Sequence, residues 1–312
     1  MQVYLAPLQG HTDWIFRESF TQHIAQFDKT FSPFIRVQNE EFYRPSQCND
    51  IIPKNNVFQT PVPQFLGNNV ASFKKFETLC QEHGYKEVNI NLGCPFSRVV
   101  DKNMGSGLLM QPERIAEILK GIFESTNLKV SVKCRLGQND ATEFEQLIPV
   151  FNDYPLEEII IHARLGIQQY KGEVDSESFA QYASQLKHAI CFNGDITSIA
   201  DIHTIKALSP NVERFMIGRG IIQHPFLLAE IRQQELSHDE KVKMIRNFHL
   251  SVIEYCKQKY SGDLHMLQRF VEFWALHAEA YEDGRKIFKM VKKCNTLSKY
   301  EGVIFKGIND IL

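Results

Sequence analysis

The sequence predicts an α/β fold in which short strands and helices alternate, followed by a helical region. Eight apolar segments of strand length recur within residues 1–227, and segments with helical periodicity separate them. The chain has 312 residues, which suits one large α/β barrel with an appended domain. Its hydrophobic content of 43% and charged content of 23% are typical of globular proteins that are soluble in water.

The expected strands follow one another at the spacing of parallel βαβ units. We place them at residues 3–6, 31–37, 62–66, 87–92, 129–135, 157–163, 189–193 and 214–218. Helical patterns cover residues 70–83, 112–124 and 198–208, and Pro112 suits the first turn of its helix. Eight such units match a (β/α)8 barrel (TIM barrel), with a doubly wound open sheet as the main alternative.

The pattern changes after about residue 225, where strand signals stop. Helices are expected at residues 238–260, 264–281, 285–294 and, with a weaker pattern, 298–312. Gly262 and Gly284 lie at the expected breaks between them. We therefore expect two domains, a barrel at residues 1–227 and a small helical bundle at residues 228–312.

Composition narrows the class of protein. The net charge of −2 gives no overall attraction to nucleic acid, so any such binding needs a local basic surface. The seven cysteines include no pair with Cys-x-x-Cys spacing, which argues against a disulfide framework and a structural zinc site, and we expect no metal. No apolar stretch is long enough to span a bilayer and no signal-peptide pattern is present, so a cytoplasmic protein is expected.

Polar residues stand at the ends of all eight expected strands. In a barrel these strand ends face one mouth, where active sites are built, so packing alone does not explain them. In chain order the residues at the strand ends are Pro7, Leu8, Gln9 and Gly10; Arg36; Gln64; Asn91 and Cys94; Lys133 and Arg135; His162 and Arg164; Asn193, Gly194 and Asp195; and Gly218, Arg219 and Gly220.

The most informative of these strand ends is the segment at residues 91–95. Pro95 fixes its own φ and pushes Cys94 toward an extended backbone, and Gly93 allows a sharp turn or a close approach to a ligand. A thiol held in this way suits catalysis, but free cysteines are also among the most buried structural residues. The local pattern leaves both interpretations open.

The last two strand ends and Lys133 indicate a phosphorylated cofactor. Glycine-containing turns after the seventh and eighth strands are a common phosphate site in barrels, and Arg219 adds a bidentate donor. Lys133 lies inside an apolar strand, where it needs an anionic ligand or forms a Schiff base. Together with Gln64, Asn91 and His162, these groups suit flavin mononucleotide (FMN), which the protein would orient and tune. The first strand is followed by no Rossmann fingerprint, which argues against a tightly held dinucleotide.

The chain also resembles a known family. The segment at residues 91–95, followed by Lys102 and by glycines at positions 105 and 107, is similar to the signature of the tRNA-dihydrouridine synthases. Residues 6–13 resemble the opening motif of that family, and the motifs at residues 133–137, 162–164, 193–195 and 217–219 follow in its order. The resemblance covers roughly residues 1–227, while the helical tail is similar to the family's tRNA-recognition domain in position and size.

The resemblance implies a mechanism and a set of site residues. NADPH would reduce FMN, a hydride would pass to C6 of a uridine flipped out of tRNA, and Cys94 would protonate C5 as a general acid. The implied enzyme is an oxidoreductase that forms 5,6-dihydrouridine. On the substrate side we expect Asn91, Arg135 and Arg164. The expected cofactor contacts are Pro7, Leu8, Gln9, Gln64, Lys133, His162, Asn193, Gly194, Asp195, Gly218 and Arg219.

The best candidate for RNA contact lies in the helical tail. Residues 285–293 carry five basic side chains and no acidic one, and Arg285, Lys286 and Lys289 are the expected phosphate contacts. Arg36 and Lys102 would continue this basic track near the barrel mouth. Charge runs are also common on solvated helix faces, so the expectation of RNA binding depends on the resemblance.

Three alternatives stay open. The first is another flavin barrel, similar to dihydroorotate dehydrogenases or old-yellow-type reductases, that acts on a small molecule. The second is a lyase that uses Lys133 as a Schiff-base nucleophile, and the third is an RNA-binding module without catalysis. The tail and residues 31–37 favour the uridine-16 subgroup of the family, and a monomer is expected.

Overall fold

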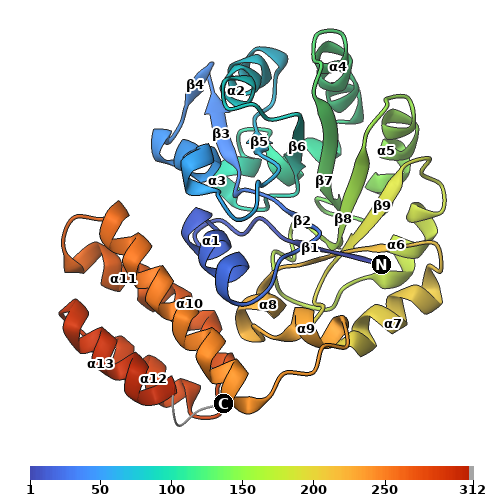
Figure 1. The fold of residues 1–312 in the computed structure, drawn as a ribbon. Coiled ribbons are helices and arrows are strands. Elements are labelled where there is room, and N and C mark those ends of the chain that lie inside the picture. The colour runs from blue at the N-terminus through green and yellow to red at the C-terminus, as the bar shows by residue number, and fades with distance from the viewer. Residues whose placement is uncertain (309–312) are drawn as a thin grey trace.

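The structure is a computed structural model that describes residues 1–308 (Figure 1). It confirms the predicted TIM barrel followed by a helical region. Within the described residues the strands form one curled sheet in the order β2-β1-β10-β9-β8-β7-β6-β5-β3-β4. Neighbouring strands are parallel except β3 and β4, which form a short antiparallel ribbon.

Most expected strands and helices lie close to where the sequence places them. The strands are β1 (Gln2–Leu5), β2 (Lys29–Thr30), β3 (Ile35–Gln38), β4 (Glu41–Phe42), β5 (Gln64–Leu66), β6 (Glu87–Leu92), β7 (Lys129–Gly137), β8 (Glu158–Leu165), β9 (Ala189–Asn193) and β10 (Arg214–Ile217). The barrel helices are α1 (Trp14–His23), α2 (Val70–Glu82), α3 (Ser97–Val100), α4 (Pro112–Phe123), α5 (Glu143–Asn152), α6 (Ser176–Ala183), α7 (Ile199–Leu208), α8 (Arg219–Gln223) and α9 (Leu227–Ile231). The later helices are α10 (His238–Lys259), α11 (Asp263–His277), α12 (Gly284–Val291) and α13 (Leu297–Ile308).

The second expected strand, at residues 31–37, is wrong in its bounds. β2 pairs with β1 on one side. The following residues pair on the other side, toward β5: Phe31 forms a bridge to Val62, and β3 pairs with β5. Pro33 interrupts the ladder because a proline has no N–H to donate. This irregular segment therefore closes the barrel between β1 and β5.

A charged cluster seals the barrel at the amino-terminal ends of its strands. Glu158 begins β8 with 1% of its side chain exposed, and it accepts hydrogen bonds from Lys29 at 2.9 Å and from Arg214 at 3.4 Å. The Tyr4 hydroxyl donates to the same carboxylate at 3.1 Å. These partners offset the cost of burying the charge, which would be high for an unpaired carboxylate. Ligands can therefore approach from the other end, where the strands finish.

The helical region packs against the first helix of the barrel. α10 begins with a capping box of Ser237 and Glu240, which satisfies backbone N–H groups of its first turn. It then runs beside α1, and the rings of Phe16 and Phe248 meet with their centroids 5.8 Å apart (Figure 1). One continuous apolar core joins the two regions. Within residues 1–308, no helix is both long enough and apolar enough to cross a membrane.

Two expected helices of the tail differ in their ends. The helix expected at residues 264–281 ends at His277 and continues as the 3-10 turn Ala278–Ala280. After this turn α12 begins at Gly284, whose backbone lies close to the Ala278 carbonyl. A side chain at position 284 would collide with that carbonyl, so glycine permits the tight turn. The helix expected at residues 285–294 is α12, which ends at Val291. The one expected at residues 298–312 is α13, and positions 309–312 lie outside the described residues.

Candidate active site

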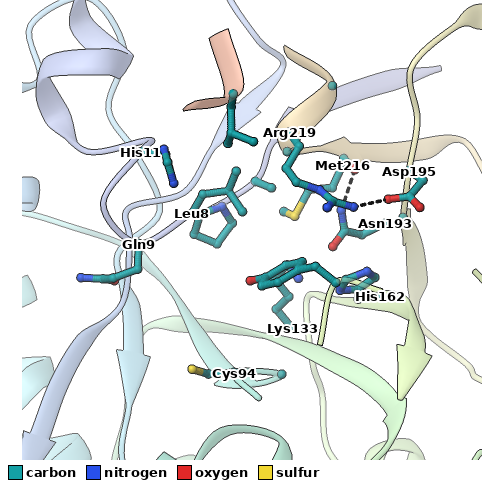
Figure 2. A pocket seen from close by; sticks show the side chains of 18 of the residues that line it. Leu8, Gln9, His11, Cys94, Lys133, His162, Asn193, Asp195, Met216 and Arg219 are labelled. Atoms are coloured by element: carbon teal, nitrogen blue, oxygen red, sulfur yellow. Dashed lines mark hydrogen bonds and ion pairs between the residues drawn. The ribbon is translucent and has the colours of Figure 1, made fainter. Parts of the chain in front are cut away.

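A cavity of about 820 Å³ opens at the carboxyl ends of the barrel strands (Figure 2). This volume is within the range of cofactor and substrate pockets. α11 completes the wall with Glu272, Ala275 and Leu276, so the helical region forms one side of the cavity. The predicted residues that line it are Pro7, Leu8, Gln9, Asn91, Cys94, Lys133, Arg135, His162, Asn193, Gly194, Asp195, Gly218 and Arg219.

The loop that carries Cys94 is held by the carboxamide of Asn91. The Asn91 Oδ1 atom accepts the backbone N–H groups of Gly93 at 3.0 Å and of Cys94 at 2.9 Å. Its Nδ2 donates to Gln64 Oε1 at 2.8 Å, and Gln64 Nε2 donates to Asn89 Oδ1 at 2.8 Å. This chain of buried amides fixes both faces of the Asn91 side chain, so the cysteine loop is preorganised.

The position of Gln64 differs from the expected one. Its side chain is fully buried beneath Asn91 and does not line the cavity, although the sequence placed it among the cofactor contacts. Gln64 is in register with Asn89, two residues before Asn91, so its inward-pointing amide lies deeper in the barrel than the cavity wall. In this structure Gln64 supports Asn91 from behind.

The Cys94 thiol lies in the cavity wall with 6% of the residue exposed. Burial raises the pKa of this thiol above its ordinary value, although a backbone N–H at Phe96 and the guanidinium of Arg135 partly oppose the rise. The thiol is therefore protonated near neutral pH. It can donate a proton more readily than it can act as a nucleophile.

The segment at residues 105–107 packs against the cysteine loop from the other side. Gly105 has a φ of +56°, and a Cβ atom there would lie 2.5 Å from the Cys94 carbonyl oxygen. That carbonyl accepts hydrogen bonds from the Ser106 hydroxyl at 3.0 Å and from its N–H at 3.1 Å. Only glycine fits this close approach, which gives a physical reason for its place in the motif.

Lys133 and His162 lie between Cys94 and Arg219 in the view of Figure 2. Burial, helped by the positive charge of Arg135, lowers the pKa of Lys133 to about 8. The same causes, burial first and then the nearby cations, lower the pKa of His162 well below its ordinary value. His162 is therefore neutral near pH 7, while Lys133 is a desolvated cation that an anionic ligand would stabilise.

Arg135 connects the cysteine loop to the end of β8. Its Nε donates to the Gly93 carbonyl at 2.9 Å, and its Nη1 donates to the Leu165 carbonyl at 2.8 Å. Two of its donor groups are thus occupied by the protein itself. Arg135 positions the Cys94 loop and also presents positive charge to the cavity.

On the far side of the cavity, Asp195 lies between two guanidinium groups. Arg219 Nη2 donates to Asp195 Oδ1 at 2.7 Å (Figure 2). Arg164 pairs with both carboxylate oxygens. Gly194 has a φ of +152°, and a Cβ atom there would lie 2.7 Å from Val174 Cγ1. The turn after β9 therefore depends on glycine, and its backbone approaches the cavity closely.

The structure revises the expected roles of two arginines. Arg164 is 1% exposed, does not line the cavity, and donates to the Gly172 carbonyl as well as to Asp195, so it supports the turn. Arg36 is 5% exposed, with its guanidinium 4.3 Å from the centre of the Tyr43 ring. Neither is presented as a free phosphate contact, because each guanidinium is covered by its own neighbours.

The other predicted basic residues lie away from the cavity wall. Lys102 is exposed after α3, and Arg285, Lys286 and Lys289 are exposed on α12. The three α12 side chains border a second hollow of about 620 Å³. Ala275 lines both hollows, so the basic face of α12 adjoins the mouth of the barrel.

Tyr170 is a cavity residue that the sequence did not single out. Its ring centre lies 5.5 Å from the guanidinium carbon of Arg135 and 5.4 Å from that of Arg219. The ring also faces His162, with centroids 6.3 Å apart. It belongs to the loop after β8, where no periodic pattern marks one aromatic residue. In the sequence the nearby Gly172 was the available sign of a turn, and the structure gives it a φ of +73°.

Comparisons with known proteins agree with the resemblance. The family model described as dihydrouridine synthase matches residues 4–301. A probable tRNA-dihydrouridine synthase of Helicobacter pylori (strain J99) is 28% identical, covering 96% of this chain and 89% of the relative. A tRNA-dihydrouridine(16) synthase of Neisseria meningitidis is 25% identical, covering 93% and 90%.

Solved structures show the same fold at much lower identity. The old yellow enzyme from Trypanosoma cruzi superposes with a TM-score of 0.53 at 9% identity, covering 76% of this chain and 89% of that one. At that identity the likeness supports the barrel fold alone. Because the family model spans nearly the whole chain, the protein belongs to the dihydrouridine synthase family.

Proposed function

We propose that this protein is an FMN-dependent tRNA-dihydrouridine synthase that uses NADPH to reduce the C5=C6 bond of a uridine. The observation that carries the proposal is the buried thiol of Cys94, which shares one cavity with Lys133 and with the Arg219–Asp195 pair. An acid, a desolvated cation and an anion-binding turn match the needs of a ring reduction by a phosphorylated flavin. Membership of the family supports the same conclusion.

The donors of the cavity suit FMN. The turns at Asn193–Asp195 and at Gly218 and Arg219 would hold the phosphate, and Lys133, His162 and residues 7–9 would contact the ring. Burial and the positive charge of Arg135 disfavour the cation of Lys133, so an anionic ring edge would stabilise it. When bound and reduced by NADPH, FMN would supply the hydride that C6 of the uridine receives.

The protein's own part in the reaction is to hold the base and supply the proton. Asn91 fixes the loop, and Cys94 transfers its thiol proton to C5, so that hydride and proton together add two hydrogens across the double bond. Arg135, whose charge partly opposes the rise in the pKa of this thiol, stabilises the thiolate that remains until solvent protonates it again. Burial keeps the thiol protonated beforehand, which suits a general acid.

The helical region at residues 228–312 is the proposed tRNA-recognition domain, appended to a catalytic barrel at residues 1–227. Its exposed basic residues Arg285, Lys286 and Lys289 would contact phosphates beside the cavity mouth. A base paired or stacked in tRNA must be extruded to reach Cys94. We expect a monomer to be active.

The target is proposed to be uridine 16, because the Neisseria meningitidis relative carries that position in its name. The difference between target positions depends on how tRNA docks on the helical region, which 25% identity leaves open to change. Mapping dihydrouridine in tRNA from a strain that lacks this protein tests the assignment. Loss of the modification at another position, with position 16 intact, would contradict it.

Substitution of Cys94 by alanine tests the catalytic proposal. We expect C94A to lose tRNA reduction by about 10²–10⁴-fold, because general acid catalysis is worth that much. The assay measures dihydrouridine by mass spectrometry after incubation with unmodified tRNA and NADPH. Oxidation of NADPH without tRNA should stay near the wild-type rate, because flavin reduction does not use the thiol.

The matched control is Cys294→Ala, which removes a half-buried thiol in the segment after α12, outside the cavity. It should reduce tRNA at the wild-type rate. Full turnover by C94A would remove Cys94 from the mechanism. A wild-type protein that reduces activated alkenes of small molecules but leaves tRNA unchanged would favour the small-molecule reductase instead.

A further inference from the structure

The last residue of α11 connects the helical region to the cavity through a buried hydrogen bond. His277 is 1% exposed, and its Nδ1 atom lies 2.8 Å from the backbone carbonyl oxygen of Ile222 in α8. Its Nε2 lies 2.9 Å from the hydroxyl of Tyr281 and 3.2 Å from Nε2 of His249. None of these side chains lines the cavity, and none is used in the proposed reaction.

The partners of His277 settle which ring nitrogen carries its proton. A carbonyl oxygen only accepts, so Nδ1 must be the protonated nitrogen and must donate to Ile222. Nε2 is then an acceptor, which the Tyr281 hydroxyl can satisfy while it accepts from His249 at 3.0 Å. Burial lowers the pKa of His277 to about 4, which agrees with a neutral ring. The imidazole of His277 in α11 is therefore a hydrogen-bond donor to α8 through Nδ1 and an acceptor through Nε2.

The carbonyl that His277 binds belongs to the element that follows the Gly218–Arg219 turn. α8 has five residues, so its last carbonyls lack partners within the helix and need them from elsewhere. At Gly220 a side chain would collide with the Ile196 carbonyl, so α8 is also pressed against the turn after β9. A shift of α8 away from α11 would therefore move both turns that face the proposed phosphate.

A second contact holds the same end of α8. Gln223 Nε2 donates to Glu279 Oε2 at 2.7 Å, and Glu279 lies in the 3-10 turn directly after α11. The same helix contributes Glu272, Ala275 and Leu276 to the cavity wall. α11 thus both lines the cavity and anchors the element that carries Arg219.

We propose that His277 is a positioning residue for the cofactor phosphate, acting through its hydrogen bond to Ile222 to hold α8 and the Gly218–Arg219 turn in place. The helical region then takes part in cofactor binding as well as in docking the tRNA. This inference rests on the proposed function, because it takes the ligand of that turn to be the phosphate of FMN.

Two substitutions at position 277 separate this link from general packing. An asparagine places its amide nitrogen near the position of Nδ1, so H277N retains a donor for Ile222. A glutamine places its amide near the position of Nε2, so H277Q retains a partner for Tyr281 and loses the bond to Ile222. Both variants are neutral and polar, and they differ mainly in which of the two links survives.

The readout is the ratio of the dissociation constants of riboflavin and FMN, measured by flavin fluorescence on the full-length apoprotein. Riboflavin lacks the phosphate, so the ratio reports the phosphate contribution alone. We expect H277Q to lower the ratio about tenfold, the effect of one well-placed hydrogen bond, with riboflavin affinity unchanged. H277N and Tyr281→Phe should keep the ratio within about twofold of wild type, because each retains the donor to Ile222.

Other outcomes contradict the proposal in different ways. A wild-type ratio in H277Q, or an equal loss for both flavins, would overturn the role of His277. A wild-type protein that binds neither flavin would overturn the proposed function, and this inference with it. If H277Q does not fold, Glu279→Ala replaces it as the test, because this variant breaks the exposed contact between Glu279 and Gln223. A ratio of dissociation constants lowered about twofold or more would support the anchoring of α8. An unchanged ratio would reject it.

Discussion

Two aspartates, Asp13 and Asp195, each lie between two cations, but their surroundings differ. Asp13 caps α1 and pairs with Lys259 at 3.1 Å and Arg269 at 2.8 Å, with 9% of its side chain exposed. Asp195 pairs with Arg164 and Arg219 at the edge of the cavity, with 37% exposed. The first cluster joins the barrel to α10 and α11, and the second faces the proposed phosphate site.

The comparison shows that burial decides whether a cluster of charges stabilises the fold or remains available to bind a ligand. Burial alone would raise the pKa of Asp13, but Arg269, Lys259 and the Phe16 N–H outweigh it and lower the pKa below its ordinary value. The pKa of Asp195 is also lowered, by Arg164 and Arg219 against a burial effect. A buried charge must keep its partners because water cannot replace them, whereas Arg219 at a half-exposed site can exchange a carboxylate for a phosphate.

The largest expected effect is the loss of stability in Asp13→Asn. The amide retains a carbonyl to cap α1 but leaves two partly buried cations without a counter-charge, so we expect a loss of about 3 kcal/mol in unfolding free energy. Urea unfolding at pH 7 measures it. Because the folded pKa of Asp13 is lowered, its contribution is present above the ordinary value of 3.8 and lost as pH falls through the folded pKa.

The matched control for Asp13 is Glu157→Gln, which breaks an exposed pair with Lys129. Exposed pairs contribute about 0–1 kcal/mol, so this variant should unfold close to wild type. Equal losses in D13N and E157Q would mean that the buried cluster gains nothing from its burial, and the contrast between the two aspartates would then fail.

The next effect concerns ligand affinity instead of stability. Arg219→Gln removes a charged donor that is 34% exposed, so the unfolding free energy should change by about 1 kcal/mol or less. FMN affinity should fall about tenfold or more, because a charge-assisted hydrogen bond is lost, while riboflavin affinity should stay the same. Parallel titrations with both flavins measure this. An equal weakening of both would show that Arg219 contacts something other than the phosphate.

The smallest expected effect is a change in pH dependence at the buried cluster. Burial, with the negative charge of Asp13, raises the pKa of Asp50 to about 6, although Arg17 and the Trp14 N–H oppose the rise. Between the ordinary pKa of 3.8 and this raised pKa, the folded state holds a proton that the unfolded state releases. The contribution of Asp50 to the unfolding free energy is therefore present below pH 3.8 and lost as pH rises through about 6.

In the wild-type protein the backbone N–H of Trp14 donates to Asp50 Oδ1 at 2.7 Å. Asp50→Asn keeps an oxygen for that N–H and removes the titrating carboxyl group. The difference in unfolding free energy between D50N and wild type should therefore change between pH 4 and pH 6.5, in favour of the variant at the higher pH. Urea unfolding at several pH values gives that difference. A difference that does not vary with pH would mean that Asp50 keeps its ordinary pKa in the fold.

The strand ends were predictable because their signals are local. Pro95 and Gly93 constrain Cys94 within three residues, and Lys133 stands out in an apolar strand whatever lies around it. The depth of Gln64 in the barrel and the position of Tyr170 beside Arg135 and Arg219 were not predictable in this way. Both depend on neighbours that are distant in the sequence.

By itself the sequence determined the alternation of strands and helices, the turns that need glycine or proline, and the polar groups at one barrel mouth. These depend on backbone geometry and on residues a few positions apart. Only the tertiary structure decided that His277 binds Ile222, 55 residues away, and that Asp13 pairs with Arg269, 256 residues away. Such pairs form because packing α11 onto the barrel buries both partners together, and no local pattern records which surfaces will meet.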